Sequence, residues 1–372
     1  MSYPYEYLGN LTFWDKKFKT VPKEMQPDIT RHEHLEKKKL LKLVSEGDVA
    51  LLMTNGVILH ASSERAGELV SEGEIVYIPW GGRPGVHYYK GRFVSGENRI
   101  AHVRNPSQLN AKYLYYALLS EMDEISECYR GGSLKHPDMN MLLHIKIPVP
   151  PMELQNKAVE MLDAFELLIS ELDRETELRT RQFEMCRERL FSVNELNPLY
   201  SAMKGRMTRT ELKKIVKLQN GKDRKAKGTL PVYGSGGIIA NDGECLSSEP
   251  TVIIPRKGSI SNLFYSEEPC FCINTVFYTE FLTDNVLPKY LFYLLQNMHL
   301  EQYNTSGSVP TLTKKVLQSL TVPYPPVDVQ ERTVEILDAL APENACSAVE
   351  EEKTERKRQF ELCLKRLVKK EK

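Results

Sequence analysis

The sequence predicts an α+β protein in which two mixed α/β modules, in a pseudo-two-fold arrangement, are separated by two long antiparallel helices that form a coiled coil. The first observation behind this fold class is a repeat. IPVPPMELQNKAVEMLDAF at Ile147–Phe165 returns as VPYPPVDVQERTVEILDAL at Val322–Leu340. The second observation is that no Pro or Gly interrupts Met152–Leu190, where apolar residues recur at alternating steps of four and three. A helix of about 39 residues and about 58 Å is therefore expected after the first repeat.

The third observation is a fainter repeat upstream of each helix. EIVYIPWGG at Glu74–Gly82 matches PTVIIPRKG at Pro250–Gly258, so each helix follows a similar module. In each module we expect short strands and one aromatic-rich helix: Glu74–Pro79, Arg92–Val94 and 111–122 in the first, and Thr251–Pro255, Asn274–Thr279 and 288–298 in the second. The predicted order is a first module at 1–150, a helix at 151–191, a linker at 192–206, a second module at 207–324 and a helix at 325–372.

Pro-Pro pairs precede both helices, because proline is tolerated just before or within the first helical turn. In the second helix, an insertion of two residues coincides with Pro342, which predicts a kink or short break near 341–344. Two helices that each carry one apolar stripe can bury the stripes against each other. The residues predicted to pack there are Leu162, Phe165, Ile169, Leu172, Phe183 and Leu190 in the first helix and Leu337, Leu340, Phe360 and Leu367 in the second.

Composition excludes several classes of protein. Lys plus Arg and Asp plus Glu are 50 each, so zero formal net charge argues against a general nucleic-acid binder. The stretch Lys204–Lys227 is strongly basic, and it is either a solvated face or a source of phosphate contacts. Seven cysteines without a CxxC pair favour reduced thiols and give no metal site. The N-terminus lacks the apolar core of a signal peptide, and no apolar run is long enough to span a membrane, so we expect a cytoplasmic protein.

Several motifs, in their order along the chain, resemble the specificity subunit of type I restriction-modification enzymes. In the second half these motifs are PVYGSGGI, IIPRKGSISN, NTVFYT, KYLFYLLQ, SVPTLTKKVL and PYPPVDVQERTVEILD, and in the first half they are YLGNLTFWDKKF, YIPWGG and IPVPPMELQ. The resemblance covers nearly the whole chain. It implies two target-recognition modules that each read half of a split, asymmetric site on double-stranded DNA.

The resemblance also implies partners. The helices are expected to dock two copies of a separate methylation subunit that carries S-adenosylmethionine, and a restriction (motor-nuclease) subunit can join them. This chain is expected to bind no cofactor or metal and to catalyse no reaction, since no S-adenosylmethionine loop, metal-spaced His pair or catalytic carboxylate pair is visible. Without the resemblance, a coiled-coil adaptor with two domains and no DNA specificity stays open.

Candidate DNA contacts follow from side-chain chemistry. Arg256 offers a bidentate contact to guanine and Lys257 a contact to phosphate, although PRKGS could equally be a surface turn. The remaining candidates in the second module are Tyr233, Ser235, Ser259, Ser308, Thr311, Thr313, Lys314 and Lys315. The first module offers Trp80, Arg83, Lys135 and His136, so different residues at corresponding places predict different half-sites.

Overall fold

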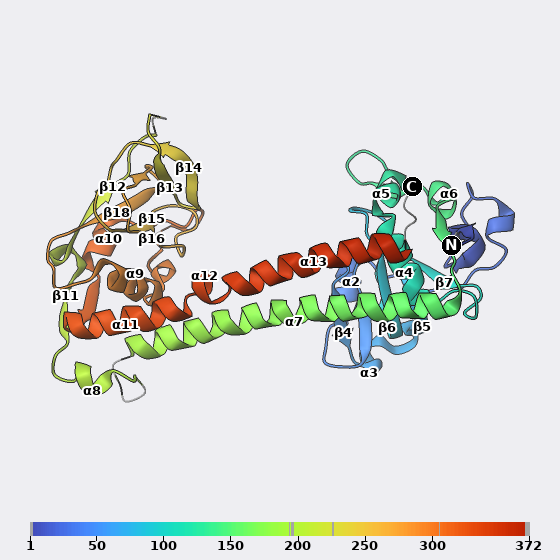
Figure 1. Cartoon of the computed structure of the whole chain (residues 1–372), viewed down its shortest axis with the longest axis horizontal. Helices are drawn as coiled ribbons and strands as arrows, with labels where there is room; N and C mark the ends of the chain where they lie inside the picture. Colours follow the sequence, from blue (N-terminus) through green and yellow to red (C-terminus); the bar gives the residue numbers. More distant parts are fainter. Residues whose placement is uncertain (1–2, 193, 195–196, 225–226, 305, 369–372) are drawn as a thin grey trace. The chain divides into compact units, whose positions relative to one another are not determined.

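The computed structural model describes residues 3–192, 194, 197–224, 227–304 and 306–368. The chain forms two compact units, one of Met1–Leu172 with Glu352–Lys372 and one of Asp173–Glu351 (Figure 1). Each unit therefore holds one module together with parts of the long helices. The mixed α and β content predicted for both modules is confirmed.

A six-stranded sheet forms the centre of the first unit. Its order is β2 (Thr12–Trp14), β7 (Asn98–Val103), β5 (Ser71–Pro79), β6 (His87–Ser95), β3 (Val49–Leu52) and β4 (Ile58–Ala61). Neighbouring strands are antiparallel except β3 and β6, which are parallel. Two small antiparallel pairs join β1 (Tyr5–Tyr7) to β10 (Lys146–Pro148) and β8 (Tyr129–Arg130) to β9 (His136–Pro137). The short helices are α1 (Leu8–Leu11), α2 (Lys37–Leu41), α3 (Ser63–Ala66), α4 (Ala111–Ser120), α5 (Met122–Cys128) and α6 (Met139–Leu143), with 3-10 turns at Lys23–Met25 and Gly67–Leu69.

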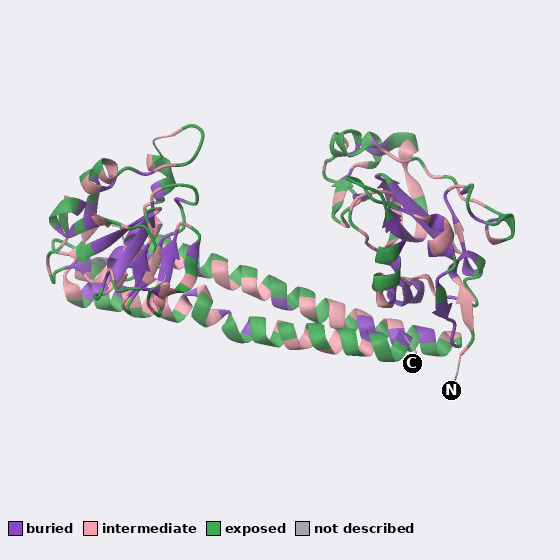
Figure 2. Ribbon diagram, turned by 90° about the horizontal axis from the view of Figure 1, so that it is seen from above, coloured by how far each residue is buried: buried purple, intermediate pink, exposed green. Residues whose placement is uncertain are grey.

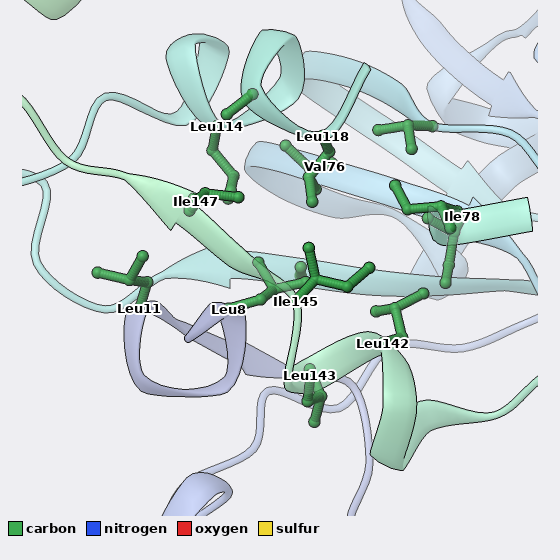
Figure 3. Close-up of a cluster of buried hydrophobic side chains, with 14 of the residues drawn as sticks. Leu8, Leu11, Val76, Ile78, Leu114, Leu118, Leu142, Leu143, Ile145 and Ile147 are labelled. Carbon is green, nitrogen blue, oxygen red and sulfur yellow. The ribbon is translucent and has the colours of Figure 1, made fainter. Parts of the chain in front are cut away.

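The second half of strand β5, residues 75–79, is buried on both faces. Successive side chains of a strand point to opposite sides, so these residues enter two different cores. Val76 and Ile78 join a core with Leu114 of α4, and this core is shown in Figure 3. Ile75 and Tyr77 face a second, smaller core. The apolar, buried part of the strand is therefore residues 75–79, and it leads directly into the loop that begins at residue 80.

The second unit contains a four-stranded sheet in the order β12 (Val216–Asn220), β18 (Val276–Phe281), β15 (Thr251–Pro255) and β16 (Phe264–Ser266). A three-stranded sheet follows in the order β14 (Gly237–Gly243), β13 (Leu230–Gly234) and β17 (Phe271–Cys272), and β11 (Thr208–Glu211) pairs with β19 (Thr321–Tyr324). Helix α8 (Tyr200–Met203) lies in the segment predicted as a linker. The helices of the module are α9 (Pro288–Asn297) and α10 (Lys314–Ser319), with 3-10 turns at Leu212–Lys214 and Leu300–Tyr303. Figure 2 shows the strands as mostly buried and the long helices as mostly exposed on their outer faces.

The long helices begin directly after the Pro-Pro pairs. Helix α7 spans Met152–Phe191 without a break, as predicted. Its counterpart is interrupted, since α11 (Val327–Leu340) is followed by α12 (Pro342–Ala345) and α13 (Ser347–Val368). Ala341 has extended backbone angles and Pro342 occupies the first turn of α12. The break predicted near residue 342 is therefore present.

In the second unit α7 runs antiparallel to the helices of the second half. Thr176 lies beside Glu350, and the Arg179 guanidinium donates to the carbonyl of Ala345 at 2.6 Å. Further along α7, Phe183 and Leu190 share a cluster with Leu337 and Ala341, against which Leu340 packs. Along the pair, the residue numbers of the contacts decrease in the second half of the chain as they increase in α7. The second unit thus shows the antiparallel packing that the heptad spacing predicts.

In the first unit α7 packs against the end of α13. Leu162 is fully buried in a core that also contains Leu364 and Val368, and Leu172 is buried as well. Phe165 and Ile169 are half-buried. The prediction for Leu367 is wrong, because this side chain is 38% exposed. A straight helix has 3.6 residues per turn, so its buried stripe drifts from a strict heptad and passes through residues 360, 364 and 368 instead.

Candidate nucleic-acid interface

The repeated stretch anchors each long helix to its module through a buried glutamine. Gln155 has no exposed surface. Its Oε1 accepts a hydrogen bond from the backbone N–H of Asn110 at 2.8 Å. Its Nε2 donates to the carbonyls of Gln108 and Pro150 at 2.9 and 2.7 Å. The side chain thereby joins the N-terminus of α4, the Pro-Pro pair and the first turn of α7.

Gln330 makes the same set of bonds in the second unit. Its Oε1 accepts from the N–H of Leu287 at 2.9 Å, and its Nε2 donates to the carbonyls of Asn285 and Pro325 at 2.8 and 2.7 Å. Because each glutamine pairs with three backbone groups, its loss would leave those groups without this partner. The sequence marked Gln155 and Gln330 as equivalent but gave no sign of these contacts.

A tyrosine, a lysine and an aspartate form a second repeated contact. Tyr116 donates to Asp163 Oδ1 at 2.6 Å, and the ammonium of Lys112 lies 2.8 Å from the same oxygen. In the second unit Tyr293 and Lys289 approach Asp338 at 2.6 and 2.9 Å. Burial and the hydrogen bond to the carboxylate raise the pKa of Tyr116 and of Tyr293.

Each of these tyrosines also contacts a phenylalanine from the other long helix. The ring of Phe360 lies 6.3 Å from Tyr116 at 64°, and the ring of Phe183 lies 6.1 Å from Tyr293 at 61°. These are edge-to-face geometries. Each unit is therefore completed by the same phenylalanine of the repeated RQFE motif, supplied by the opposite half of the chain.

Two pairs of loops carry most of the predicted DNA contacts. We call residues 80–86 with 131–135 the first loop pair, and residues 256–263 with 306–313 the second loop pair. In the first pair the N–H of Gly82 donates to the carbonyl of Lys135 at 2.9 Å, and in the second the N–H of Gly258 donates to that of Pro310 at 2.9 Å. Both glycines have positive φ, at 97° and 81°. The structure thus brings together segments that are far apart in sequence, in the same way in both modules.

The residue that follows the central strand forms a cation–π pair in both modules. It supplies the aromatic ring in the first module and the cation in the second. Trp80 follows β5, and the guanidinium carbon of Arg99 lies 4.3 Å from its ring centre. Arg256 follows β15, and its guanidinium carbon lies 5.2 Å from the ring of Phe277. The strand register makes the positions equivalent, since Ile78 pairs with Arg99 and Ile254 pairs with Phe277. The outer member of the pair is an indole in the first module and a guanidinium in the second.

The first loop pair gathers three predicted residues at one end of the sheet, and the fourth, His136, directly follows it in β9. Trp80 is half-buried and Arg83, Lys135 and His136 are exposed. His136 Nδ1 lies 2.7 Å from the carbonyl oxygen of Trp80, which fixes the imidazole beside the indole. Lys16 lies 4.4 Å from the Trp80 ring centre. Cations therefore surround an accessible aromatic ring, an arrangement suited to nucleic acid.

The buried support of Trp80 was missed from the sequence. Arg99 Nη1 and His34 Nε2 both lie 2.8 Å from Asp15 Oδ2, and the Asp15 side chain is 2% exposed. Burial alone would raise the pKa of Asp15, but the hydrogen bond with His34 and the charge of Arg99 outweigh it and the pKa is lowered. The carboxylate thus stays ionised and holds Arg99 under the indole. The FWDKK motif contained Asp15 and Lys16 but did not indicate their tertiary neighbours.

The second loop pair brings Arg256 and Lys257 beside the SVPTLTKK segment. Residues 257 and 311 form an isolated bridge, and the N–H of Leu312 donates to the carbonyl of Arg256 at 2.9 Å. Lys257, Ser259, Ser308 and Lys315 are exposed, whereas Thr311 and Lys314 are half-buried. The hydroxyl of Thr313 accepts from the N–H of Val316 and caps α10, so its first role is structural.

The prediction that Tyr233 contacts DNA is wrong. Its side chain is buried in a cluster with Ile253 and Cys272, because β13 lies between β14 and β17. The ring therefore belongs to the core of the second module and offers no stacking surface. Ser235, in the turn that follows, is half-buried and lies outside the second loop pair.

Ion pairs neutralise part of the basic stretch at 204–227. Lys213 lies 2.9 Å from Glu211, Lys217 lies 3.4 Å from Glu280, and Arg224 pairs with Asp242. These cations are exposed and already have carboxylate neighbours. The structure therefore favours a solvated face for this part of the stretch, which was one of its two sequence interpretations.

Two modules of one design define a duplicated DNA-recognition protein, since each has a cationic loop pair and the same anchor to a long helix. The family described as type I restriction modification DNA specificity domain matches the chain twice, over residues 47–179 and 209–355. The chain belongs to this family, and it is a specificity subunit that recognises DNA.

Individual relatives agree with this assignment. A type I restriction enzyme specificity subunit of Haemophilus influenzae is 27% identical over 297 residues, which cover 72% of this chain and 74% of the relative. A type I specificity subunit of Mycoplasma genitalium is 24% identical over 251 residues, with 63% and 65% covered. The fold resembles the crystal structure of a type I restriction-modification S subunit from M. genitalium, with a TM-score of 0.64, 20% identity and coverage of 100% and 97%. In the described part of the chain, no helix is long and apolar enough to cross a membrane.

Proposed function

We propose that each module reads one half of a bipartite, asymmetric DNA site and that the long helices set the spacing between the halves. The observation that carries this proposal is the inverted pair of Trp80 with Arg99 and Arg256 with Phe277 on one shared backbone scaffold. The scaffold presents a side chain at the same place in both modules. Because the two side chains differ in chemistry, the two half-sites differ in sequence.

The outer side chains indicate how the half-sites differ. A guanidinium has donors in a planar fork that fits the O6 and N7 acceptors of guanine, so Arg256 favours guanine in the half-site of the second module. An indole offers an apolar face and no comparable fork, so Trp80 favours stacking or contact with a thymine methyl. The hydroxyls and lysines of the loop pairs contact phosphates and fix the register.

The long helices are proposed to dock two methylation subunits. In the second unit α7 exposes the large apolar side chains of Leu178 and Met185, which line a shallow pocket with Cys186, Leu190 and Pro198. Exposed apolar patches of this kind are typical of protein interfaces. The equivalence of the two halves supports two copies of the subunit, one for each half.

Catalysis is assigned to the other subunits. We place methyl transfer and its S-adenosylmethionine on the methylation subunits, and DNA translocation and cleavage on a restriction subunit that joins the complex. The chain itself then contributes recognition and geometry, without a metal or cofactor of its own. The assembly acts on chromosomal and incoming DNA, which places it in the cytoplasm.

Methylation sequencing of a bacterial host tests this proposal. The host carries the methylation subunit encoded beside this gene, with and without the gene itself. The expected result is a new modified motif of two different half-sites separated by a fixed gap of unspecified bases, present only with the gene. A motif that does not depend on the gene would favour the alternative, a scaffold without DNA specificity.

A further inference from the structure

One loop of each pair carries an exposed aliphatic side chain. Leu134 follows Gly132 and Ser133 in the first module, and Val309 follows Gly307 and Ser308 in the second. Leu134 is 56% exposed and Val309 is 52% exposed. Single exposed aliphatic residues are common on protein surfaces and carry no meaning alone. These two, however, occupy the same place in two modules.

Their equivalence is structural as well as sequential. Leu134 directly precedes Lys135 and Val309 directly precedes Pro310, and these are the residues whose carbonyls bind Gly82 and Gly258. We call Leu134 and Val309 with the two residues before each of them the loop tips. The same backbone hydrogen bond therefore holds each loop tip in place.

Leu134 and Val309 are only partly covered by their surroundings, although Leu134 Cδ2 lies near Gly81. A Cβ added at Gly132 or Gly307 would meet no atom within 4 Å, so neither glycine is required by a close approach. More than half of each aliphatic side chain is exposed, and neither belongs to a described apolar core.

The surroundings of the tips are cationic and polar. Arg83 and Lys135 are exposed in the first loop pair, and Lys257 is exposed in the second. Exposed hydroxyls precede each aliphatic residue, at Ser133 and Ser308. An exposed apolar side chain next to cations and hydroxyls is complementary to DNA, whose phosphates flank apolar base surfaces in the grooves.

We propose that Leu134 and Val309 each contact the apolar surface of a base in their own half-site and add to its specificity. This inference rests on the proposed function. The base surface is either a thymine methyl group in the major groove or the face of a base at an opened step, both of which aliphatic side chains contact in protein–DNA complexes. Leu134 acts on the half-site of the first module and Val309 on the half-site of the second.

The test uses the complex of this chain with its methylation subunits and a duplex that carries the mapped motif. Leu134→Ser and Val309→Ser are compared with Leu282→Ser and Val57→Ser, which remove matched side chains that are 57% and 48% exposed outside the loop pairs. Each loop variant is expected to bind the duplex about tenfold more weakly, whereas the controls bind as the unmodified complex does. Leu134→Met, which keeps an apolar tip, is expected to restore most of the affinity.

Modified duplexes distinguish a contact with a thymine methyl group from a contact with the face of a base at an opened step. If the contact is a thymine methyl, replacing one thymine by uracil in the first half-site weakens the unmodified complex about tenfold and does not weaken Leu134→Ser further. If the contact is an opened step, uracil has no effect, and a mismatch at that step restores binding by Leu134→Ser.

Loop variants that bind as tightly as the controls overturn the inference. So do variants that lose methylation subunits from the complex, measured by native mass spectrometry, because the tips would then be protein contacts. Failure of the proposed function gives a different result, in which the unmodified complex itself shows no preference for any motif.

Discussion

Replacing Gln330 by alanine is expected to destabilise the second unit by about 3–4 kcal/mol. The side chain is fully buried and makes three hydrogen bonds of 2.7–2.9 Å. Each neutral hydrogen bond contributes about 1 kcal/mol net, and a buried group left without a partner adds to the loss. Gln155→Ala should have a similar effect on the first unit, because its contacts are the same in kind and number.

Hydrogen exchange measured by mass spectrometry, together with urea unfolding, checks this prediction. Gln330→Ala should speed exchange in α9 and in the first turns of α11 while exchange in α4 stays unchanged, and Gln155→Ala should do the reverse. Glu335→Ala is the matched control, because Glu335 also belongs to the repeated stretch but is exposed and pairs with Arg332 at the surface. The control should change stability by no more than about 0.5 kcal/mol. If Gln330→Ala lowers the free energy of unfolding by less than about 1 kcal/mol, Gln330 does not anchor the long helix to its module.

The remaining predictions concern recognition, spacing and pH. Arg256→Ala should weaken recognition of one half-site by about 1–3 kcal/mol, with methylation sequencing showing a relaxed base there and an unchanged second half; equal relaxation of both halves would contradict the assignment. Inserting four residues in both long helices, after Leu172 and after Glu352, adds about 6 Å and nearly restores the apolar stripe, so the mapped motif should keep its halves and gain one or two base pairs in its gap. Retention of the original gap would exclude a spacing role. Burial and the nearby His102 lower the pKa of His32 to about 4. Because the unfolded imidazole takes up its proton first, stability of the first unit should fall as pH drops from about 6.5 to about 4, and His32→Phe should flatten this slope in urea titrations. An unchanged slope would remove His32 as the cause.

The long helices were predictable because their signals are local. The Pro-Pro pairs, the absence of Gly and Pro in α7 and the insertion at Pro342 each act within a few residues of where they occur. The prediction that Leu367 packs between the helices was wrong because it relied on a heptad count. A heptad count assumes that the stripe stays fixed on the helix, whereas the end of α13 follows the module surface through Leu364 and Val368.

The site was predictable in its residues but not in its assembly. Side-chain chemistry identified Trp80 and Arg256, and the structure puts both at the same point of the scaffold. Their supports, Arg99 and Phe277, lie about twenty residues further along and are brought there by strand pairing, which no local pattern encodes. Tyr233 misled because a tyrosine in a glycine-rich turn resembles an exposed contact.

A chain with two copies of the first module tests the division of the site most directly. Residues 4–149 replace residues 208–324, so the joins fall at the equivalent strand pairs β1 with β10 and β11 with β19. The long helices, and therefore the spacing, are kept. Methylation sequencing should then show a symmetric motif in which both halves are inverted copies of the first half-site, with the original gap. A motif that keeps the half-site of the replaced module, or that stays asymmetric, would contradict the claim that each module reads its own half.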